Sequence, residues 1–276
     1  MPLISSGSWR DKSAWEDFWQ NATKTGQAGL TDTHVEKTYL PESPLLGYGY
    51  AKDAFLDNAH TQKRILFVGN GMSLKPLDYY FSGFDVTVLD ISVAACELFK
   101  SRMIAVFKNV ESFLQNVTLT STGYQREYAE SNRLNKFIYR PGGRIEVVCA
   151  DMFDWQPKQT WNYIYNQLAF LPFSEEEQDF LLNRYYSWLE DHGGLQINYY
   201  FFPEHPFKRI VDVAKAIGFL VHDEDINEVF GKAMAYKSDP QKVKEIMKNY
   251  TIEEYKKELL RKDGRKMLWV IWGSVL

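Results

Sequence analysis

Cysteine is scarce in this 276-residue sequence, which contains only Cys96 and Cys149. The two residues lie in dissimilar sequence surroundings, so they suggest neither a disulfide framework nor a cysteine-rich metal cluster. The sequence also lacks the ligand spacing that is typical of metal sites. These absences favour a reducing compartment, and we expect a cytoplasmic protein without a bound metal.

Long apolar runs and a strong net charge are also missing. No apolar run approaches the roughly 18–20 residues that a membrane-spanning helix needs. The start, "MPLISSGSWRDKSAWEDFW", reaches charged residues before any long apolar segment, so we expect no signal peptide and no membrane association. The formal net charge of −4 provides no overall attraction to phosphate backbones, and no nucleic-acid partner is expected.

Strand-like and helix-like segments alternate along the chain. Short segments rich in apolar, β-branched and aromatic residues predict strands at 64–68, 85–90, 142–155 (with an exit loop), 160–170, 195–202, 220–222 and 266–274. Such alternation requires a mostly parallel sheet that is covered on both faces. The sequence therefore predicts an α/β fold with a doubly wound, seven-stranded sheet and helices on both faces.

A single domain is expected over residues 1–276, with three additions. The segment "WEDFW" places aromatic residues at helical spacing, and we interpret about 9–30 as an N-terminal lid helix. Polar and aromatic residues without a clear period indicate an insertion at about 116–143. Mixed charges with a helical period indicate a helical cap at about 237–262.

One predicted helix, "SEEEQDFLLNRYYSWLEDHGG", has marked ends. Ser174 and Glu177 have the spacing of a capping box, which satisfies backbone N–H groups at a helix start. Gly193 and Gly194 are of the residue type that commonly ends a helix. The sequence therefore predicts that this helix runs to the glycine pair.

The segment "ILFVGNGMS" takes the first predicted strand directly into a small glycine loop. Gly69 and Gly71 allow a ligand to approach the backbone, because glycine has no Cβ. Asp90 follows Gly71 by nineteen positions, ends the second strand and can accept both hydroxyls of a ribose. Asp151 ends the third strand, where it can reach an adenine amino group. Since parallel strands end at one edge of a sheet, these residues predict an adenosine-shaped site.

A purely structural interpretation of the same residues stays open. A glycine pair after a strand often forms only a turn, and the segment from Asp90 to Ser92 can simply start a helix. The combination of a glycine loop with two acids at strand ends favours the ligand site.

The glycine loop also indicates which cofactor to expect. The dinucleotide fingerprint G-x-G-x-x-G would need glycine where Leu74 stands, whereas G-x-G-x-S runs here from Gly69 to Ser73. This is nearer the E/D-x-G-x-G-x-G loop of class I S-adenosylmethionine-dependent methyltransferases. The chain resembles the thiopurine S-methyltransferase branch of that family, whose W-x-x-x-W helix matches Trp15 and Trp19.

Further short motifs carry this resemblance, and others depart from it. The acid-Ile-Ser continuation of the branch matches "DIS", and its "FD" after the third strand matches Phe153 and Asp154. Phe67 stands where many class I enzymes have the leading acid of the loop. Asn166 and Gln167 stand where the branch has an Asp-Arg pair, so an arginine that could hold an anionic acceptor is missing.

The resemblance implies S-adenosylmethionine as cofactor, S-adenosylhomocysteine as product, and an antiparallel last strand at 266–274. The predicted cofactor-binding residues are Trp15, Trp19, Gly69, Asn70, Gly71, Asp90, Ile91, Asp151, Met152 and Asn166. The predicted substrate-binding residues are Gln167, Phe170 and Tyr199. No catalytic residue is named, because the methyl carbon of a sulfonium is already activated and the protein mainly aligns the attack and excludes water.

The sequence thus predicts methyl transfer to a small, aromatic or apolar acceptor with a sulfur, nitrogen or oxygen nucleophile. Two alternatives stay open: a non-catalytic protein that binds S-adenosylmethionine or a nucleotide, and a nicotinamide-dependent reductase.

Overall fold

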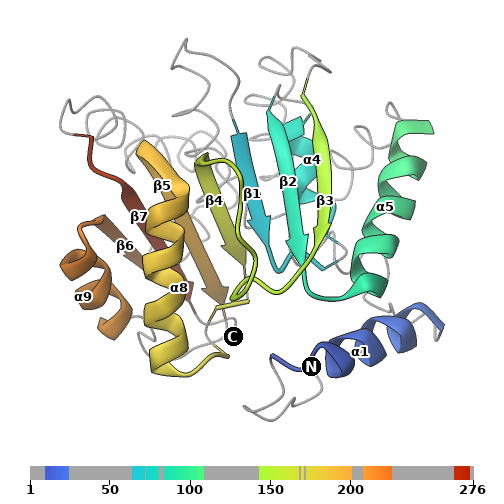
Figure 1. Ribbon diagram of the computed structural model, residues 1–276, viewed down its shortest axis with the longest axis horizontal. Helices are drawn as coiled ribbons and strands as arrows, with labels where there is room; N and C mark the ends of the chain where they lie inside the picture. The colour runs from blue at the N-terminus through green and yellow to red at the C-terminus, as the bar shows by residue number, and fades with distance from the viewer. Residues whose placement is uncertain are drawn as a thin grey trace, which may run out of the picture.

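A computed structural model of the chain is shown in Figure 1. It describes residues 10–24, 64–71, 73–80, 84–108, 143–167, 169–170, 172–200, 208–225 and 264–273. The strands are β1 (Arg64–Val68), β2 (Asp85–Asp90), β3 (Ile145–Cys149), β4 (Trp161–Gln167), β5 (Leu189–Tyr200), β6 (Leu220–Asp225) and β7 (Met267–Gly273). The helices are α1 (Lys12–Lys24), α4 (Lys75–Tyr80), α5 (Val93–Lys108), α8 (Glu175–Trp188) and α9 (Lys208–Ile217).

The strands form one seven-stranded sheet in the order β3-β2-β1-β4-β5-β7-β6. The chain runs outward from β1 in one direction through β2 and β3, and in the other through β4 and β5, so the sheet is doubly wound. Figure 1 shows α8 and α9 in front of the sheet and α4 behind it. The predicted α/β architecture with helices on both faces is therefore confirmed.

The predicted antiparallel last strand is wrong. β7 lies between β5 and β6 and pairs in parallel with both. A parallel neighbour requires the chain to return to the amino edge of the sheet, which takes a crossover of about a dozen residues or more. The segment between β6 and β7 is long enough for that return.

Helix α8 begins as predicted but ends earlier. The Ser174 side chain accepts from the backbone N–H of Glu177, and the Glu177 side chain accepts in return from the backbone N–H of Ser174. The helix ends at Trp188, because Leu189 is already extended and begins β5. The prediction that the helix runs to the glycine pair is therefore wrong. A Cβ on Gly193 would lie 2.7 Å from the Glu190 carbonyl oxygen, so this glycine allows a close backbone approach within β5.

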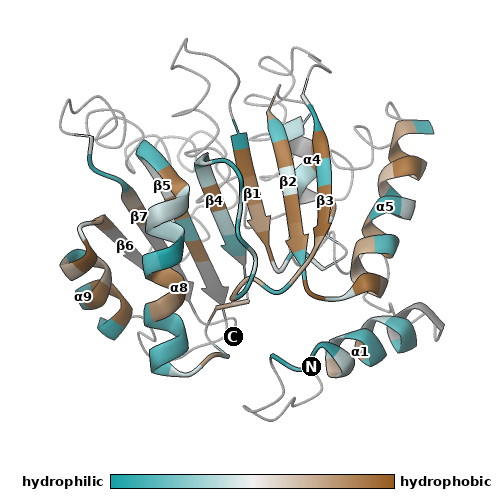
Figure 2. Ribbon diagram, in the orientation of Figure 1, coloured by the Kyte–Doolittle hydropathy of each residue, from teal (hydrophilic) through white to brown (hydrophobic). Residues whose placement is uncertain are grey.

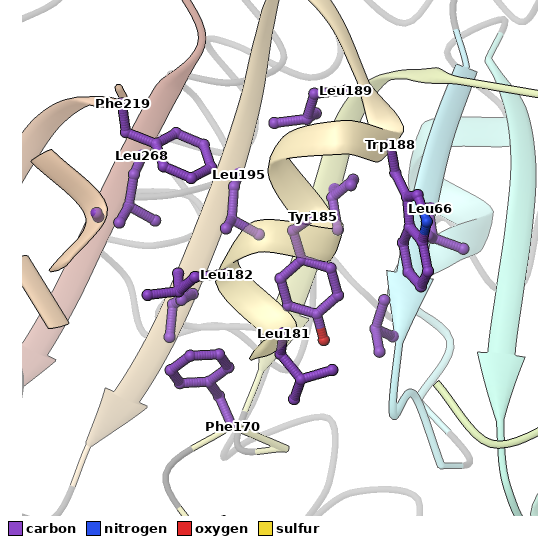
Figure 3. Close-up of a cluster of buried hydrophobic side chains, with 14 of the residues drawn as sticks. Leu66, Phe170, Leu181, Leu182, Tyr185, Trp188, Leu189, Leu195, Phe219 and Leu268 are labelled. Carbon is purple, nitrogen blue, oxygen red and sulfur yellow. The ribbon is translucent and has the colours of Figure 1, made fainter. Parts of the chain in front are cut away.

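Side chains on the strands alternate between the two faces of the sheet. On one face, aromatic residues of the strands meet α4, with 5.4 Å between the ring centroids of Phe67 and Tyr79. The other face packs against α8 and α9 (Figure 3) and buries residues including Leu66, Val68, Ile164, Phe170, Leu181, Leu182, Tyr185, Trp188, Leu195, Phe219 and Leu268. In Figure 2 strands β1 and β2 are mainly hydrophobic, whereas α1 is mostly hydrophilic.

The structure describes only part of the predicted additions. Helix α1 lies within the predicted lid at 9–30, of which residue 9 and residues 25–30 lie outside the described ranges. The insertion predicted at 116–143, apart from Gly143, and the cap at 237–262 also lie outside them, so both stay predictions. Among the helices that the structure describes, none has the length and apolar composition to cross a membrane.

Candidate functional site

The candidate site lies at the carboxyl edge of the sheet, where the direction of winding reverses between β1 and β4. Because every strand is parallel to its neighbours, the ends of β1, β2, β3 and β4 meet at this edge. Ligands of open α/β sheets bind at such a switch point, outside the carboxyl ends of the strands. Figure 1 shows α1 below the arrowheads of β2 and β3, beside the start of α5.

The glycine loop after β1 needs its glycines for conformational reasons. Gly69 and Gly71 have φ angles of 64° and 55°, in the left-handed region that side chains disfavour. The side-chain amide of Asn70 donates to the carbonyl oxygens of Gly71 at 3.3 Å and Ser73 at 3.0 Å. The Asn70 side chain therefore stabilises the loop through hydrogen bonds to its backbone.

Asp90 joins the glycine loop to the end of β2. Its Oδ2 accepts a 2.8 Å hydrogen bond from the backbone N–H of Gly71, and its Oδ1 accepts a 3.0 Å bond from the N–H of Ser92. Each carboxylate oxygen has a second lone pair, so both oxygens can still accept from a ligand hydroxyl.

Asp90 is buried, with only 8% of its surface exposed. Burial raises the pKa of Asp90 above its ordinary value; the hydrogen bonds from Ser92 and Gly71 oppose this rise, and the nearby charge of Glu16 adds to it. A ligand that donates to the carboxylate would replace part of the lost hydration.

Trp19 covers the glycine loop from the N-terminal helix. A Cβ placed on Gly71 would lie 2.6 Å from Cζ2 of the Trp19 indole, so the ring rests directly on this glycine. Trp15 lies on the same helix and makes an edge contact with Phe18, with 5.9 Å between ring centroids. The structure thus brings the predicted lid tryptophan and the predicted loop glycine together.

Glu16 is a site residue that sequence reasoning missed. Its carboxylate accepts from the Ser92 hydroxyl at 2.9 Å and from the backbone N–H of Ala94 at 3.1 Å. Ser92 is the N-cap of α5, since its hydroxyl also accepts from the Ala95 N–H at 3.1 Å. A carboxylate at a helix N-terminus is stabilised by the unpaired N–H groups there. Glu16 therefore fastens α1 to the start of α5.

These contacts also set the charge state of Glu16. Burial acts to raise its pKa, but the hydrogen bonds from Ala94, Gln20 and Ser92 outweigh burial, and the pKa of Glu16 is lowered. No local sequence signal could have found this role, because Ser92 lies 76 positions further along the chain.

The exit loop of β3 is the third part of the site. Asp151 Oδ1 accepts a 2.8 Å bond from the backbone N–H of Phe153. Arg10 lies just before α1, and its guanidinium nitrogens lie 3.8 Å from Asp151 Oδ2 and 3.5 Å from a Glu177 carboxylate oxygen. The same guanidinium group lies 4.3 Å from the centroid of the Phe153 ring. Exposed ion pairs of this length contribute little to stability.

A buried polar chain links Met152 to β4. Asn166 Nδ2 donates to the Tyr185 hydroxyl at 2.9 Å, and this hydroxyl donates to the Met152 sulfur at 3.3 Å. Asn166 is 0% exposed, and its Oδ1 has no hydrogen-bond partner among the described residues. Burial raises the pKa of Tyr185, which therefore stays a neutral phenol.

The remaining predicted residues are placed less centrally. The carbonyl oxygen of Ile91 accepts from the Cys149 thiol at 3.6 Å. Phe170 is buried against Tyr185 in the core, with 6.4 Å between ring centroids. Gln167 and Tyr199 lie at the carboxyl ends of β4 and β5. Among the residues described, no three His, Cys, Asp or Glu side chains are grouped to hold a metal ion.

Comparisons with known proteins give matches only among solved structures. No family model matches the chain. No curated protein matches it either.

The solved structures that it resembles include S-adenosylmethionine-dependent methyltransferases. The glycopeptide N-methyltransferase MtfA, complexed with S-adenosyl-L-methionine, is 14% identical over 52% of this chain and 51% of its own, with a TM-score of 0.32. The plantazolicin methyltransferase BpumL, in complex with S-adenosylhomocysteine, is 15% identical over 67% of this chain and 53% of its own, with a TM-score of 0.36. Phosphoethanolamine N-methyltransferase 2 of Haemonchus contortus is 14% identical over 78% of this chain and 47% of its own, with a TM-score of 0.41. This chain spans about half the length of the solved structures that it matches.

Proposed function

We propose that this chain transfers a methyl group from S-adenosylmethionine to a small, aromatic or apolar acceptor. The observation that carries the proposal is the pairing of Asp90 with the Gly71 N–H at 2.8 Å. It places a buried carboxylate and a glycine loop side by side at the switch point of the sheet. A ligand with a ribose diol next to a backbone-binding group fits that pair.

The residues present at the edge fit such a cofactor. Asp90 would hold the ribose hydroxyls, Asp151 the adenine amino group, and Gly69 and Gly71 would let the cofactor approach the backbone. Trp19 would cover it from α1. The cofactor supplies a methyl group on a sulfonium, so the protein needs to align an acceptor in line with that bond and to exclude water.

The predicted acceptor site lies on the β4 and β5 side of the sheet edge. The predicted substrate residues Gln167 and Tyr199 lie at neighbouring strand ends, on the side of β1 away from Asp90. Neither carries a formal charge, and Asn166 beside them is neutral too. An uncharged acceptor therefore suits this side of the site better than an anionic one.

Calorimetric titration with S-adenosylmethionine, S-adenosylhomocysteine and NADH tests the cofactor. We expect binding of the first two and none of NADH; binding of NADH alone would support the reductase instead. Formation of S-adenosylhomocysteine in the presence of a panel of aromatic thiols, amines and phenols then tests the reaction. Binding without turnover on any acceptor would favour a non-catalytic binding protein, a role that the neutral Asn166–Gln167 pair also suits.

A further inference from the structure

The two cysteines of the chain, Cys96 and Cys149, come together at the end of β2, although they lie far apart in the sequence. Both are free thiols. The Cys96 sulfur lies 3.9 Å from the carbonyl oxygen of Asp90. The Cys149 thiol donates to the next carbonyl oxygen, that of Ile91, at 3.6 Å. The two thiols therefore contact consecutive peptide groups.

The backbone on either side of Cys149 lies at the same place. The Cys96 sulfur is also 3.9 Å from the carbonyl oxygen of Val148, the residue before Cys149. The backbone N–H of Ala150, the residue after it, donates at 2.9 Å to the Asp90 carbonyl oxygen that the Cys96 thiol contacts. Asp90 and Cys149 are also partners in the register of β2 and β3. The Cys96 thiol therefore lies against the segment of β3 that carries Cys149.

The alternation of side chains along β3 sets the direction of Cys149. Val148 and Ala150 pack against the core cluster on the α8 side of the sheet, so Cys149 between them points to the opposite face. Helix α5 packs against β2 and β3 and lies beside β3 in Figure 1. Cys96 is one of the buried residues of this helix. The two thiols therefore meet at the contact between α5 and β3.

The two thiols differ in exposure and therefore in reactivity. Cys149 is exposed, so a small solute can reach its sulfur, whereas Cys96 is only 2% exposed. Burial raises the pKa of Cys96 to about 12, and the charge of Asp90 and the neighbouring Cys149 add to this rise. Because thiolates are the reactive form and access decides which sulfur is attacked, Cys149 should react first and Cys96 second.

We propose that Cys96 and Cys149 form an oxidation site, at which a peroxide converts the two thiols into a disulfide between α5 and β3. In the first step the Cys149 sulfur attacks one oxygen of the peroxide and the O–O bond breaks. The attacked hydroxyl stays on the sulfur as a sulfenic acid, and the other oxygen takes the Cys149 proton and leaves as water or an alcohol.

In the second step the Cys96 sulfur attacks the Cys149 sulfur, and the S–S bond forms as the S–O bond breaks. The hydroxyl leaves with the Cys96 proton as water. The thiol pair thus loses the electron pair that the peroxide gains. An added dithiol should reverse the modification by thiol–disulfide exchange. The cofactor takes no part in these steps, so this inference does not depend on the proposed function.

The test treats the reduced, folded protein with hydrogen peroxide, unfolds it, and then labels all remaining thiols with N-ethylmaleimide before measuring its intact mass. We expect the oxidised protein to take up no label, to have lost the mass of the two thiol hydrogens, and to remain a monomer on a non-reducing gel. Dithiothreitol should restore labelling of both cysteines. The mass of the peptide that joins Cys96 to Cys149 identifies the bond.

Two variants separate the roles of the thiols. In Cys149→Ser the buried Cys96 should stay reduced and take up the label. In Cys96→Ser the exposed Cys149 should be oxidised, and dimedone, which traps sulfenic acids, should label it. The wild-type protein should give little dimedone product, because Cys96 consumes the sulfenic acid.

Three results would overturn the proposal. The first is a wild-type protein that gains oxygen on Cys149 while Cys96 remains free, which would show that the two sulfurs cannot meet. The second is a disulfide between two chains. The third is the absence of any reaction with peroxide, which would show that Cys149 is not reactive.

Discussion

The backbone N–H of Gly71 donates a 2.8 Å hydrogen bond to Oδ2 of Asp90, nineteen positions further along the chain. This bond makes the glycine loop after β1 and the acid at the end of β2 parts of one unit. Asp90 therefore shapes the loop, and under the proposed function its carboxylate would also accept from the ribose hydroxyls.

Replacing Asp90 with alanine should weaken the binding of S-adenosylhomocysteine by about 1.5–3 kcal/mol, the usual range for a hydrogen bond to a charged group. Calorimetric titration measures the loss. Glu97→Ala, which removes an exposed acid on α5 that forms an ion pair with Lys100, is the control and should bind normally. Unchanged affinity in a folded Asp90→Ala variant would contradict the ribose assignment.

The raised pKa of Asp90 predicts that stability and binding respond to pH in opposite directions. The folded pKa lies above the ordinary value of 3.8, so the contribution of Asp90 to the free energy of unfolding is full below that value and is lost as pH rises through the folded pKa. Ligand hydroxyls need the carboxylate, so affinity should increase over the same interval. Urea unfolding and ligand titration across the acid range measure the two slopes.

Asp90→Asn should flatten both of these pH dependences. If the affinity of the wild-type protein were constant across the interval while Asp90 titrates, the carboxylate would not be a ligand group.

Gly71 should not tolerate a side chain. Gly71→Val adds bulk where Trp19 rests, 2.6 Å from the new Cβ, and strains a backbone with φ of 55°. We expect cofactor binding to be lost while the circular dichroism spectrum stays native-like. In the smaller variant Gly71→Ala, a second substitution, Trp19→Ala, should relieve the clash between the new Cβ and the indole ring. The strain of a non-glycine residue at this positive φ angle should remain. Normal binding by Gly71→Val would mean that the loop is only a turn.

The N-terminal helix should depend on Glu16 for its attachment. Glu16→Ala removes the acceptor of the Ser92 hydroxyl and the Ala94 N–H, so the amides of α1 should exchange with solvent faster. Asp17→Ala, the exposed neighbour on the same helix, is the matched control and should leave the exchange rates unchanged. Equal rates in the two variants would show that aromatic packing alone holds α1.

Residues 9–30, the predicted lid, should respond to bound ligand. If residues 9–30 close over a bound cofactor, S-adenosylhomocysteine should increase their protection against hydrogen exchange. Deleting residues 1–20 should abolish binding and leave the sheet folded. Equal protection with and without the ligand would make Trp15 and Trp19 ordinary packing residues, and the lid would be ruled out.

Features that depend on neighbouring residues could be predicted from the sequence. The strand segments, the glycine loop and the Ser174–Glu177 capping box are short patterns whose physical causes lie within a few positions. The alternation of strands and helices then leads to a parallel sheet. Because parallel strands end at one edge, it also indicates that Gly71 and Asp90 lie close together, as the structure shows.

Features that depend on distant partners were decided only by the tertiary structure. β7 is parallel because it pairs between β5 and β6, and its own residues suit either direction. Helix α8 stops at Trp188, because the following backbone finds partners in the sheet before the chain reaches Gly193. Glu16 caps a helix 76 positions away from it, and Asn166 is oriented by Tyr185 across the core. Hydrogen bonds between such distant residues form only after the chain has folded, so no local pattern records them.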